Sequence, residues 1–148
     1  MEFSHVSVLL DESVEGLAIK PDGIYVDGTV GGAGHSRKIA EKLTSGGLLI
    51  ALDRDPDAVR IAAERLNGYN AKVIRSNYSD LRFVLDSLGI EKTDGVLLDL
   101  GVSSHQLDTA ERGFSYHKDA PLDMRMSQEG ISAYDIVNNY TKEQLSKI

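Results

Sequence analysis

The most constraining feature of the sequence is an alternation, between residues 20 and 100, of short apolar runs with longer segments of helical period. Strands that are covered by helices on both faces read as nearly continuous apolar runs, and parallel strands need a crossover between them. The order therefore predicts a parallel sheet in an α/β fold. The four predicted strands are residues 23–27, 47–53, 71–75 and 94–99, of which the third is the least apolar.

The segments between these runs carry helix signals. Asp55-Pro56 places a capping acid before a proline at the first helical position, and apolar residues recur at helical spacing from there to Leu66. A helix is therefore predicted over 56–66. Two further helices are predicted over 36–43 and 80–88, each ending near glycine.

The two ends of the chain are less regular. Residues 1–20 are expected to form a strand-like or helical lead-in, packed by Val6, Val8, Leu9 and Leu10. After the fourth strand come about thirty residues with little periodicity, which is long for a connection inside a compact domain. Two capping boxes then predict helices beginning after Ser132 and Thr141, the second with barely one turn before Ile148. We therefore expect the chain to stop in mid-structure.

Composition excludes several classes of protein. The 148 residues make one domain's worth of chain, with no cysteine for disulfides or thiolate metal sites. No apolar run approaches the ~18–20 residues that span a bilayer, and no export signal is visible, so a cytoplasmic protein without membrane contact is expected. The net charge of -7 argues against an extended phosphate-binding surface on this chain.

Four glycines follow the first predicted strand, at Gly28, Gly31, Gly32 and Gly34. Glycines at this place let a ligand approach the backbone closely, although they also serve simply to make a tight turn. Their spacing does not match the dinucleotide fingerprint, which disfavours nicotinamide and flavin cofactors. The phosphate-binding loop that ends in Gly-Lys-Ser/Thr is also absent, which disfavours nucleoside triphosphate hydrolysis. The glycines after the first strand therefore have no indicated pyrophosphate ligand.

Acids end three of the four predicted strands, at Asp27, Asp53 and Asp99. The carboxyl ends of parallel strands share one edge of the sheet, where ligands bind in such folds. An acid at the end of the second strand suits both hydroxyls of a ribose, whereas Asp55 and Asp57 are better explained as helix-cap residues. An electronegative cleft favours the cationic sulfonium of S-adenosylmethionine.

Several longer strings occur together in this chain and resemble the bacterial 16S ribosomal RNA cytosine-N4 methyltransferase family, also called small-subunit methyltransferase H. The resemblance covers essentially all 148 residues. The strings are His5-Val6-Ser7-Val8-Leu9-Leu10-Asp11-Glu12, Asp27-Gly28-Thr29 through Gly34-His35-Ser36, Asp53-Arg54-Asp55-Pro56, Leu98-Asp99-Leu100-Gly101-Val102-Ser103-Ser104, Gln106-Leu107-Asp108, Glu111-Arg112-Gly113-Phe114-Ser115 and Pro121-Leu122-Asp123-Met124-Arg125-Met126.

The resemblance implies a Rossmann-like class I S-adenosylmethionine-dependent methyltransferase fold that transfers methyl to the exocyclic amine of one cytidine in the decoding region of 16S ribosomal RNA. The substrate is then that RNA or the small ribosomal subunit. By position, the family's cofactor contacts fall on Ala33, Gly34, His35, Asp53, Tyr78, Asp99 and Gln106. Tyr78 fits physically, since an aromatic ring after the third strand can stack against adenine.

The chain departs from the family in length. Members are about twice as long, with a helical insertion after Met126 and a C-terminal segment that completes the sheet. Residues 1–126 are therefore expected to form the cofactor-binding core with an incomplete parallel sheet, and residues 127–148 the start of the helical insertion. The Asp/Asn/Ser-Pro-Pro-aromatic signature of many DNA amino-methyltransferases is absent after the fourth strand.

The expected chemistry singles out a second group of residues. The cytosine amine is a poor nucleophile and must be aligned with the methyl group, for which Asp99 or a neighbouring backbone carbonyl is the candidate. The target base must be splayed out of its stack, and Arg112, Phe114 and Tyr116 are candidates for stacking and phosphate contacts. No metal is expected, because His5, His105 and His117 lack ligand spacing.

Two further expectations concern the chain as it stands. A non-catalytic, truncated cofactor-binding fragment or interaction module is the alternative to an active enzyme, and it predicts weak or absent cofactor binding without methylation of the RNA. The sheet edge beside the fourth strand is expected to be unpaired, which predicts self-association or swapping between chains.

Overall fold

The computed structural model describes residues 7–148 and contains one parallel sheet of four strands. The strand order is β3-β2-β1-β4, so both central strands are the earliest in the sequence. The predicted α/β class, the four strands and their parallel pairing are confirmed. The strands are β1 (Ile24–Asp27), β2 (Leu48–Asp53), β3 (Ala71–Arg75) and β4 (Gly95–Leu97).

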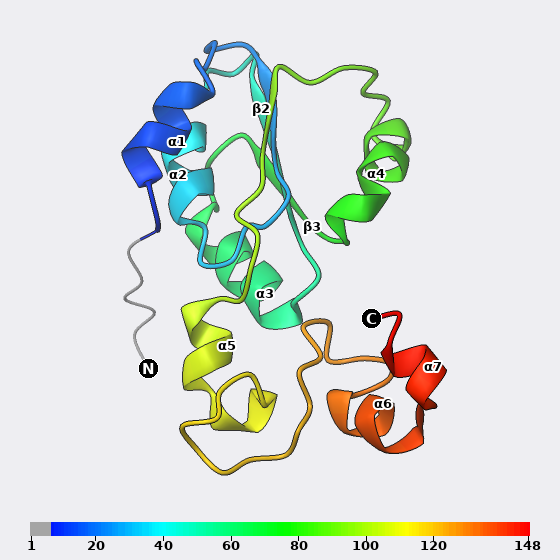
Figure 1. Cartoon of the computed structure of the whole chain (residues 1–148). Coiled ribbons are helices and arrows are strands. Elements are labelled where there is room, and N and C mark those ends of the chain that lie inside the picture. The colour runs from blue at the N-terminus through cyan, green and yellow to red at the C-terminus, as the bar shows by residue number, and fades with distance from the viewer. Residues whose placement is uncertain (1–6) are drawn as a thin grey trace. The chain divides into compact units, whose positions relative to one another are not determined.

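Helices cover both faces of this sheet, as Figure 1 shows for α1, α2 and α3 on one side and α4 on the other. The helix α3 begins as predicted, with Pro56 in its first turn and the Asp55 carboxylate accepting from the Asp57 N–H at 3.0 Å. The helices of this part are α1 (Leu10–Gly16), α2 (Gly34–Ala40), α3 (Pro56–Arg65) and α4 (Leu81–Ser87), with the 3-10 turn η1 (Tyr78–Asp80) before α4.

Two apolar clusters fill the space between these layers. On one face Tyr25, Leu49 and Ile39 are buried with residues of α1 and α3. On the other face Ile50 and Leu52 pack against Val84 and Leu85 of α4. Side chains of β1 and β2 alternate between the two clusters, which explains why these two strands read as unbroken apolar runs.

The structure corrects part of the predicted lead-in. It is helical from Leu10, which packs against the first cluster, but Val8 and Leu9 are 63% and 65% exposed and do not pack as expected. Leu9 has a left-handed backbone, with φ of 49°, so its side chain leaves the helical pattern before α1 begins. Val6 lies outside the described residues.

The chain divides by its contacts into two compact units, residues 1–100 and 101–148. This division falls before the boundary at residue 126 that the sequence predicted, and the assignment of 127–148 to a helical insertion stays a prediction. Both predicted capping boxes, at Ser132 and Thr141, are confirmed. The elements of the second unit are α5 (Ser104–Asp108), η2 (Ala110–Arg112), α6 (Ala133–Asn139) and α7 (Lys142–Leu145).

The segment after β4, expected to lack regular structure, holds α5 and η2. Gly113, with φ of 71°, ends η2 at a close crossing of the chain. A Cβ there would come within 2.5 Å of the Pro121 carbonyl oxygen, so only glycine fits. Across residues 7–148, no helix has the length and apolar character needed to cross a membrane.

Candidate cofactor site at the carboxyl edge of the sheet

The glycine loop, residues 28–34, leaves β1 at the carboxyl edge of the sheet and is bound to the strands on both sides. The Gly28 N–H donates to the Leu97 carbonyl of β4 at 2.9 Å, and the Val30 N–H donates to the Leu52 carbonyl of β2 at 2.8 Å. Gly31 has a left-handed backbone, with φ of 47°. The loop is therefore held by backbone bonds between its two neighbouring strands.

Asp27 fixes the inside of this loop. Its carboxylate accepts from the Thr29 N–H at 3.1 Å and from the Ser36 hydroxyl at 2.7 Å, and the residue is only 1% exposed. Burial raises the pKa of Asp27 above its ordinary value, while these two hydrogen bonds act in the opposite direction. Of the three acids expected to line one cleft, Asp27 is thus a buried group that shapes the loop.

Asp53 lies at the end of β2 with its two oxygens turned to different backbone groups. One accepts from the Gly31 N–H and the other from the Asp55 N–H, both at 2.9 Å. Burial raises the pKa of Asp53, and the hydrogen bonds oppose this shift. The carboxylate remains part-exposed, and each of its oxygens has a second lone pair for a ligand hydroxyl.

Two more predicted residues meet the same loop. The Asp99 N–H donates to the Thr29 hydroxyl at 2.7 Å, which ties the segment after β4 to the loop, and the Asp99 side chain is exposed. Tyr78 follows β3, and a Cβ on Gly28 would lie 3.1 Å from the Tyr78 Cβ and 2.5 Å from Leu98. Gly28 must be glycine because these two side chains close over it.

The end of the loop turns into α2. Ala33 is buried and has a left-handed backbone with φ of 63°, a conformation that few residues other than glycine adopt. Gly34 faces the lead-in, since a Cβ there would collide with the Ser7 hydroxyl. The His35 ring lies 3.0 Å from the Val8 carbonyl through Nε2 and is 7% exposed. The His35 side chain therefore contacts the lead-in.

Three residues that stabilise this site were missed by the sequence analysis. Thr29 and Ser36 bind Asp99 and Asp27, and Arg65 on α3 donates from Nη1 to the Gly32 carbonyl at 2.6 Å. The two hydroxyls stand within the motif but were not weighed. Arg65 gives no sequence signal, because its place depends on how α3 packs beside the loop.

The remaining candidates lie in the second unit. Gln106 is 5% exposed, and its side chain closes the capping box of α5 by accepting from the Ser103 N–H. Arg112 is 8% exposed and donates from Nη2 to the carbonyls of Arg125 and Met126 at 3.2 and 3.0 Å. Tyr116 is 93% exposed. The roles of these residues toward cofactor or RNA stay predictions.

The first unit thus brings six of the predicted residues onto one edge or its adjoining loop: Ala33, Gly34, His35, Asp53, Tyr78 and Asp99. A glycine loop, a fixed carboxylate and an aromatic ring are the groups that recognise a nucleoside joined to a polar chain. Asp53, Tyr78 and Asp99 come from three different strand ends and converge on one loop, which is the strongest geometric sign of a ligand site.

Known proteins are similar to this chain over nearly its whole length. A model of the MraW methylase family matches residues 2–148. The chain is 57% identical over 151 residues to the ribosomal RNA small subunit methyltransferase H of Clostridioides difficile, covering 100% of this chain and 49% of that protein. It is 59% identical over 152 residues to small subunit methyltransferase H 2 of Agathobacter rectalis, covering 100% and 48%. The chain spans about half the length of these relatives.

Among solved structures, one from Klebsiella pneumoniae that is described as an O-methyltransferase aligns with a TM-score of 0.50 at 19% identity. The alignment covers 68% of this chain and 47% of that chain. At this identity the likeness concerns the fold alone, and it agrees with the predicted Rossmann-like fold.

Proposed function

The chain belongs to the MraW methylase family, and on that premise we propose that it carries the S-adenosylmethionine site of a methyltransferase acting on small-subunit ribosomal RNA. The observation that carries this proposal is the convergence of three strand ends on the glycine loop. Gly31, Thr29 and Gly28 meet Asp53, Asp99 and Tyr78 respectively. The names of the relatives supply the substrate class.

The residues of this edge are proposed to bind different parts of the cofactor. Asp53 accepts the ribose hydroxyls, because the Gly31 and Asp55 amides already hold its carboxylate in place. Tyr78 offers an aromatic face, 43% exposed, to the adenine. The loop backbone between Ala33 and His35 receives the methionine end of the cofactor. The bound cofactor supplies an electrophilic methyl group.

For the acceptor we propose the N4 amine of a cytidine in the decoding region of 16S ribosomal RNA. The lone pair of this amine is conjugated with the ring, so the enzyme must orient it toward the methyl group. The exposed Asp99 carboxylate can accept a hydrogen bond from the amine. The Asp99 backbone N–H donates to the Thr29 hydroxyl, which fixes the position of the backbone that carries this carboxylate.

We place the activity in the cytoplasm, where ribosomal RNA is found in bacteria, with the RNA or the small subunit as the partner. Phe114, Tyr116 and Arg112 are proposed to contact the RNA.

The competing proposal is a cofactor-binding fragment or interaction module without turnover. It is considered because the chain spans only 49% of the length of the Clostridioides difficile relative.

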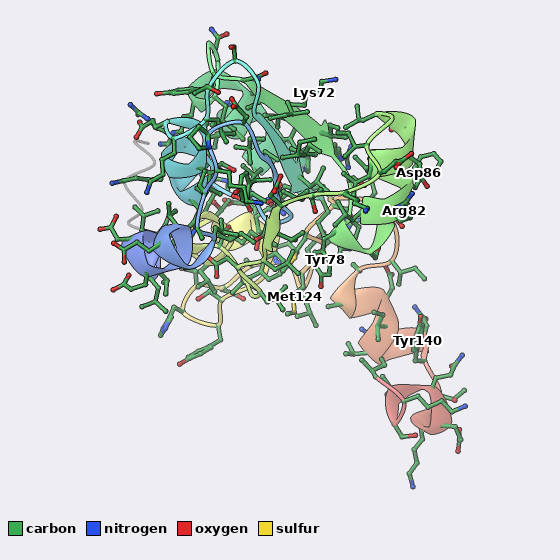
Figure 2. The ribbon with its side chains drawn as sticks, turned by 90° about the horizontal axis from the view of Figure 1, so that it is seen from above. Lys72, Tyr78, Arg82, Asp86, Met124 and Tyr140 are labelled. Atoms are coloured by element: carbon green, nitrogen blue, oxygen red, sulfur yellow. The ribbon has the colours of Figure 1, made fainter. Side chains whose placement is uncertain are left out.

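A methyl-transfer assay tests the proposal. The 148-residue chain is incubated with small ribosomal subunits and methyl-labelled S-adenosylmethionine, and the RNA is digested to nucleosides. The proposal expects label in N4-methylcytidine and at least a tenfold loss for Asp99→Ala. Asp86→Ala is the matched control, since Asp86 lies on α4 beside Arg82 (Figure 2).

The outcomes separate the two candidates. Full turnover by Asp99→Ala would refute the role of this carboxylate, and label in another nucleoside would refute the N4 target. Weak or absent cofactor binding together with no transfer to RNA would favour the non-catalytic fragment.

A further inference from the structure

The second unit contains a cleft whose lining includes none of the residues proposed to bind the cofactor. It has a volume of about 360 Å³ and lies between the end of α5 and the segment that follows η2. A cleft of this size is in the range that proteins use for small ligands. Its lining residues are Leu107, Asp108, Phe114, Ser115, Tyr116, His117 and Lys118.

Three of the seven residues that line this cleft carry aromatic rings. The Tyr116 side chain is 93% exposed, and its ring centroid lies 4.4 Å from that of His117 with the planes 34° apart. Phe114 lies beneath the Arg112 guanidinium, 5.9 Å from its ring centroid. Phe114 therefore contacts Arg112, while Tyr116 and His117 lie against each other and are exposed.

Polar contacts fix the shape of the segment that carries these rings. The His117 N–H donates to the Ser115 hydroxyl at 3.2 Å, and the Lys118 ammonium donates to the Asp108 carbonyl at 3.4 Å. The second contact joins the two sides of the cleft. It also places a positive charge next to the rings.

We propose that this cleft binds one unpaired nucleobase of the substrate RNA, which stacks on Tyr116 and His117 while Lys118 contacts the adjoining phosphate. Single-stranded RNA is recognised by such a combination of aromatic faces and a cation along its backbone. The proposal rests on the proposed function, because the RNA substrate is part of it.

The lining favours a nucleobase over an apolar peptide anchor. An apolar side chain in the cleft would remove water from the Asp108 carboxylate and the Lys118 ammonium and offer neither of them a polar group in exchange. A base and its phosphate offer both, since exocyclic amines donate to a carboxylate and phosphates accept from an ammonium. Arg112 serves here as a positioning residue, because its guanidinium supports Phe114 and donates to backbone carbonyls.

Binding of a fluorescently labelled single-stranded RNA of the decoding-region sequence tests the cleft, measured by anisotropy on the 148-residue chain. Tyr116→Leu is expected to weaken binding about tenfold, the effect of one lost base stack, and Tyr116→Phe to leave it within twofold. Lys118→Gln is expected to lower the salt dependence by about one phosphate contact. Tyr134→Leu is the control, since Tyr134 is 61% exposed in the same unit but outside the cleft.

Each variant is also titrated with S-adenosylhomocysteine, which separates this proposal from the proposed function. RNA affinity unchanged in Tyr116→Leu, equal losses in Tyr116→Leu and Tyr134→Leu, or no RNA binding by the unaltered chain would each overturn the cleft proposal. Failure of the unaltered chain to bind S-adenosylhomocysteine would instead count against the proposed function. Retained cofactor binding with a loss of RNA affinity specific to Tyr116→Leu supports the cleft.

Discussion

The two units of the chain are stabilised by opposite kinds of buried groups. In the first unit, central strand residues such as Ile50 and Leu52 are completely buried between helices. In residues 101–148, all of which the structure describes, the buried residues are Gln106 and Arg112, and both are polar. The first unit therefore has an apolar core, whereas the two buried residues of the second unit are polar and form hydrogen bonds.

This difference predicts how stable each unit is toward local opening and substitution. Apolar burial is spread over many residues, so the first unit keeps a fixed edge on which a ligand site can be built. The second unit leaves large apolar side chains exposed, including Leu122 and Met124 at 41% and 46%. Its local order rests on a few polar contacts, and such regions open more easily than a packed core.

The largest expected effect is on the core of the first unit. Leu52→Ala removes a side chain that is 0% exposed and should lower the free energy of unfolding by about 2–5 kcal/mol. Leu122→Ala, the matched change in the second unit, should cost less than about 1 kcal/mol. Denaturant unfolding of both variants checks this. Equal losses would show that the second unit has a core of its own.

The next effect concerns Arg112. Arg112→Ala removes the donors to the carbonyls of Arg125 and Met126 and should destabilise the second unit by about 1–3 kcal/mol. Hydrogen exchange should then accelerate within residues 101–148 and stay unchanged at β2. Unchanged protection from exchange at Met124, whose N–H donates to the Arg112 carbonyl, would contradict the account that the Arg112 side chain stabilises this unit.

The same contrast decides what the sequence could predict. Runs such as 47–53 are apolar because both faces of the strand are covered, so periodicity identified them. β4 ends at Leu97 rather than Asp99, because the Asp99 N–H binds Thr29 and leaves the ladder.

α5 has five residues, too few for a helical period, and its Ser103 capping box was its only signal. The predicted packing of Val8 and Leu9 was wrong, because composition does not reveal the left-handed backbone of Leu9.

Strand-end acids were recognised as a group because parallel strands bring their carboxyl ends together. The difference between Asp27 and Asp53 was beyond the sequence, since it depends on Ser36 reaching back from α2 to fill one carboxylate. Arg65 was missed for the same reason, because its partner Gly32 lies 33 residues earlier in the chain.

A third prediction tests the raised pKa of Asp27. The folded-state pKa of Asp27 is raised by burial, so Asp27 contributes stability that is fully present below the unfolded value of about 3.9 and is lost as pH rises through the folded pKa. Asp27→Asn removes this titration. The unfolding free energy of the unaltered chain minus that of the variant should fall as pH rises from 4 toward neutrality. A difference that grows with pH would mean that the hydrogen bonds of Asp27 outweigh its burial.

The smallest expected effect is at the sheet edge. Within residues 7–148, β4 pairs only with β1, and Val96 on β4 is 43% exposed. Self-association through this edge is predicted, with Val96→Lys weakening it about fivefold because a charge blocks strand pairing. Sedimentation across a concentration series checks this. Lys72→Ala on β3 at the opposite edge is the control, and a monomer at all concentrations would contradict the prediction.

Calorimetric titration with S-adenosylhomocysteine tests the central claim most directly, that Asp53 and the glycine loop form a nucleoside cofactor site. The unaltered chain should bind, and Asp53→Ala should weaken binding about 10- to 100-fold through loss of charged hydrogen bonds. Asp53→Asn keeps an acceptor for the Gly31 N–H but turns its NH₂ group toward the Asp55 N–H, so it should lose affinity and also unfold at a lower denaturant concentration. Equal affinity in the unaltered chain and both variants, or binding of NADH in place of S-adenosylhomocysteine, would contradict the account.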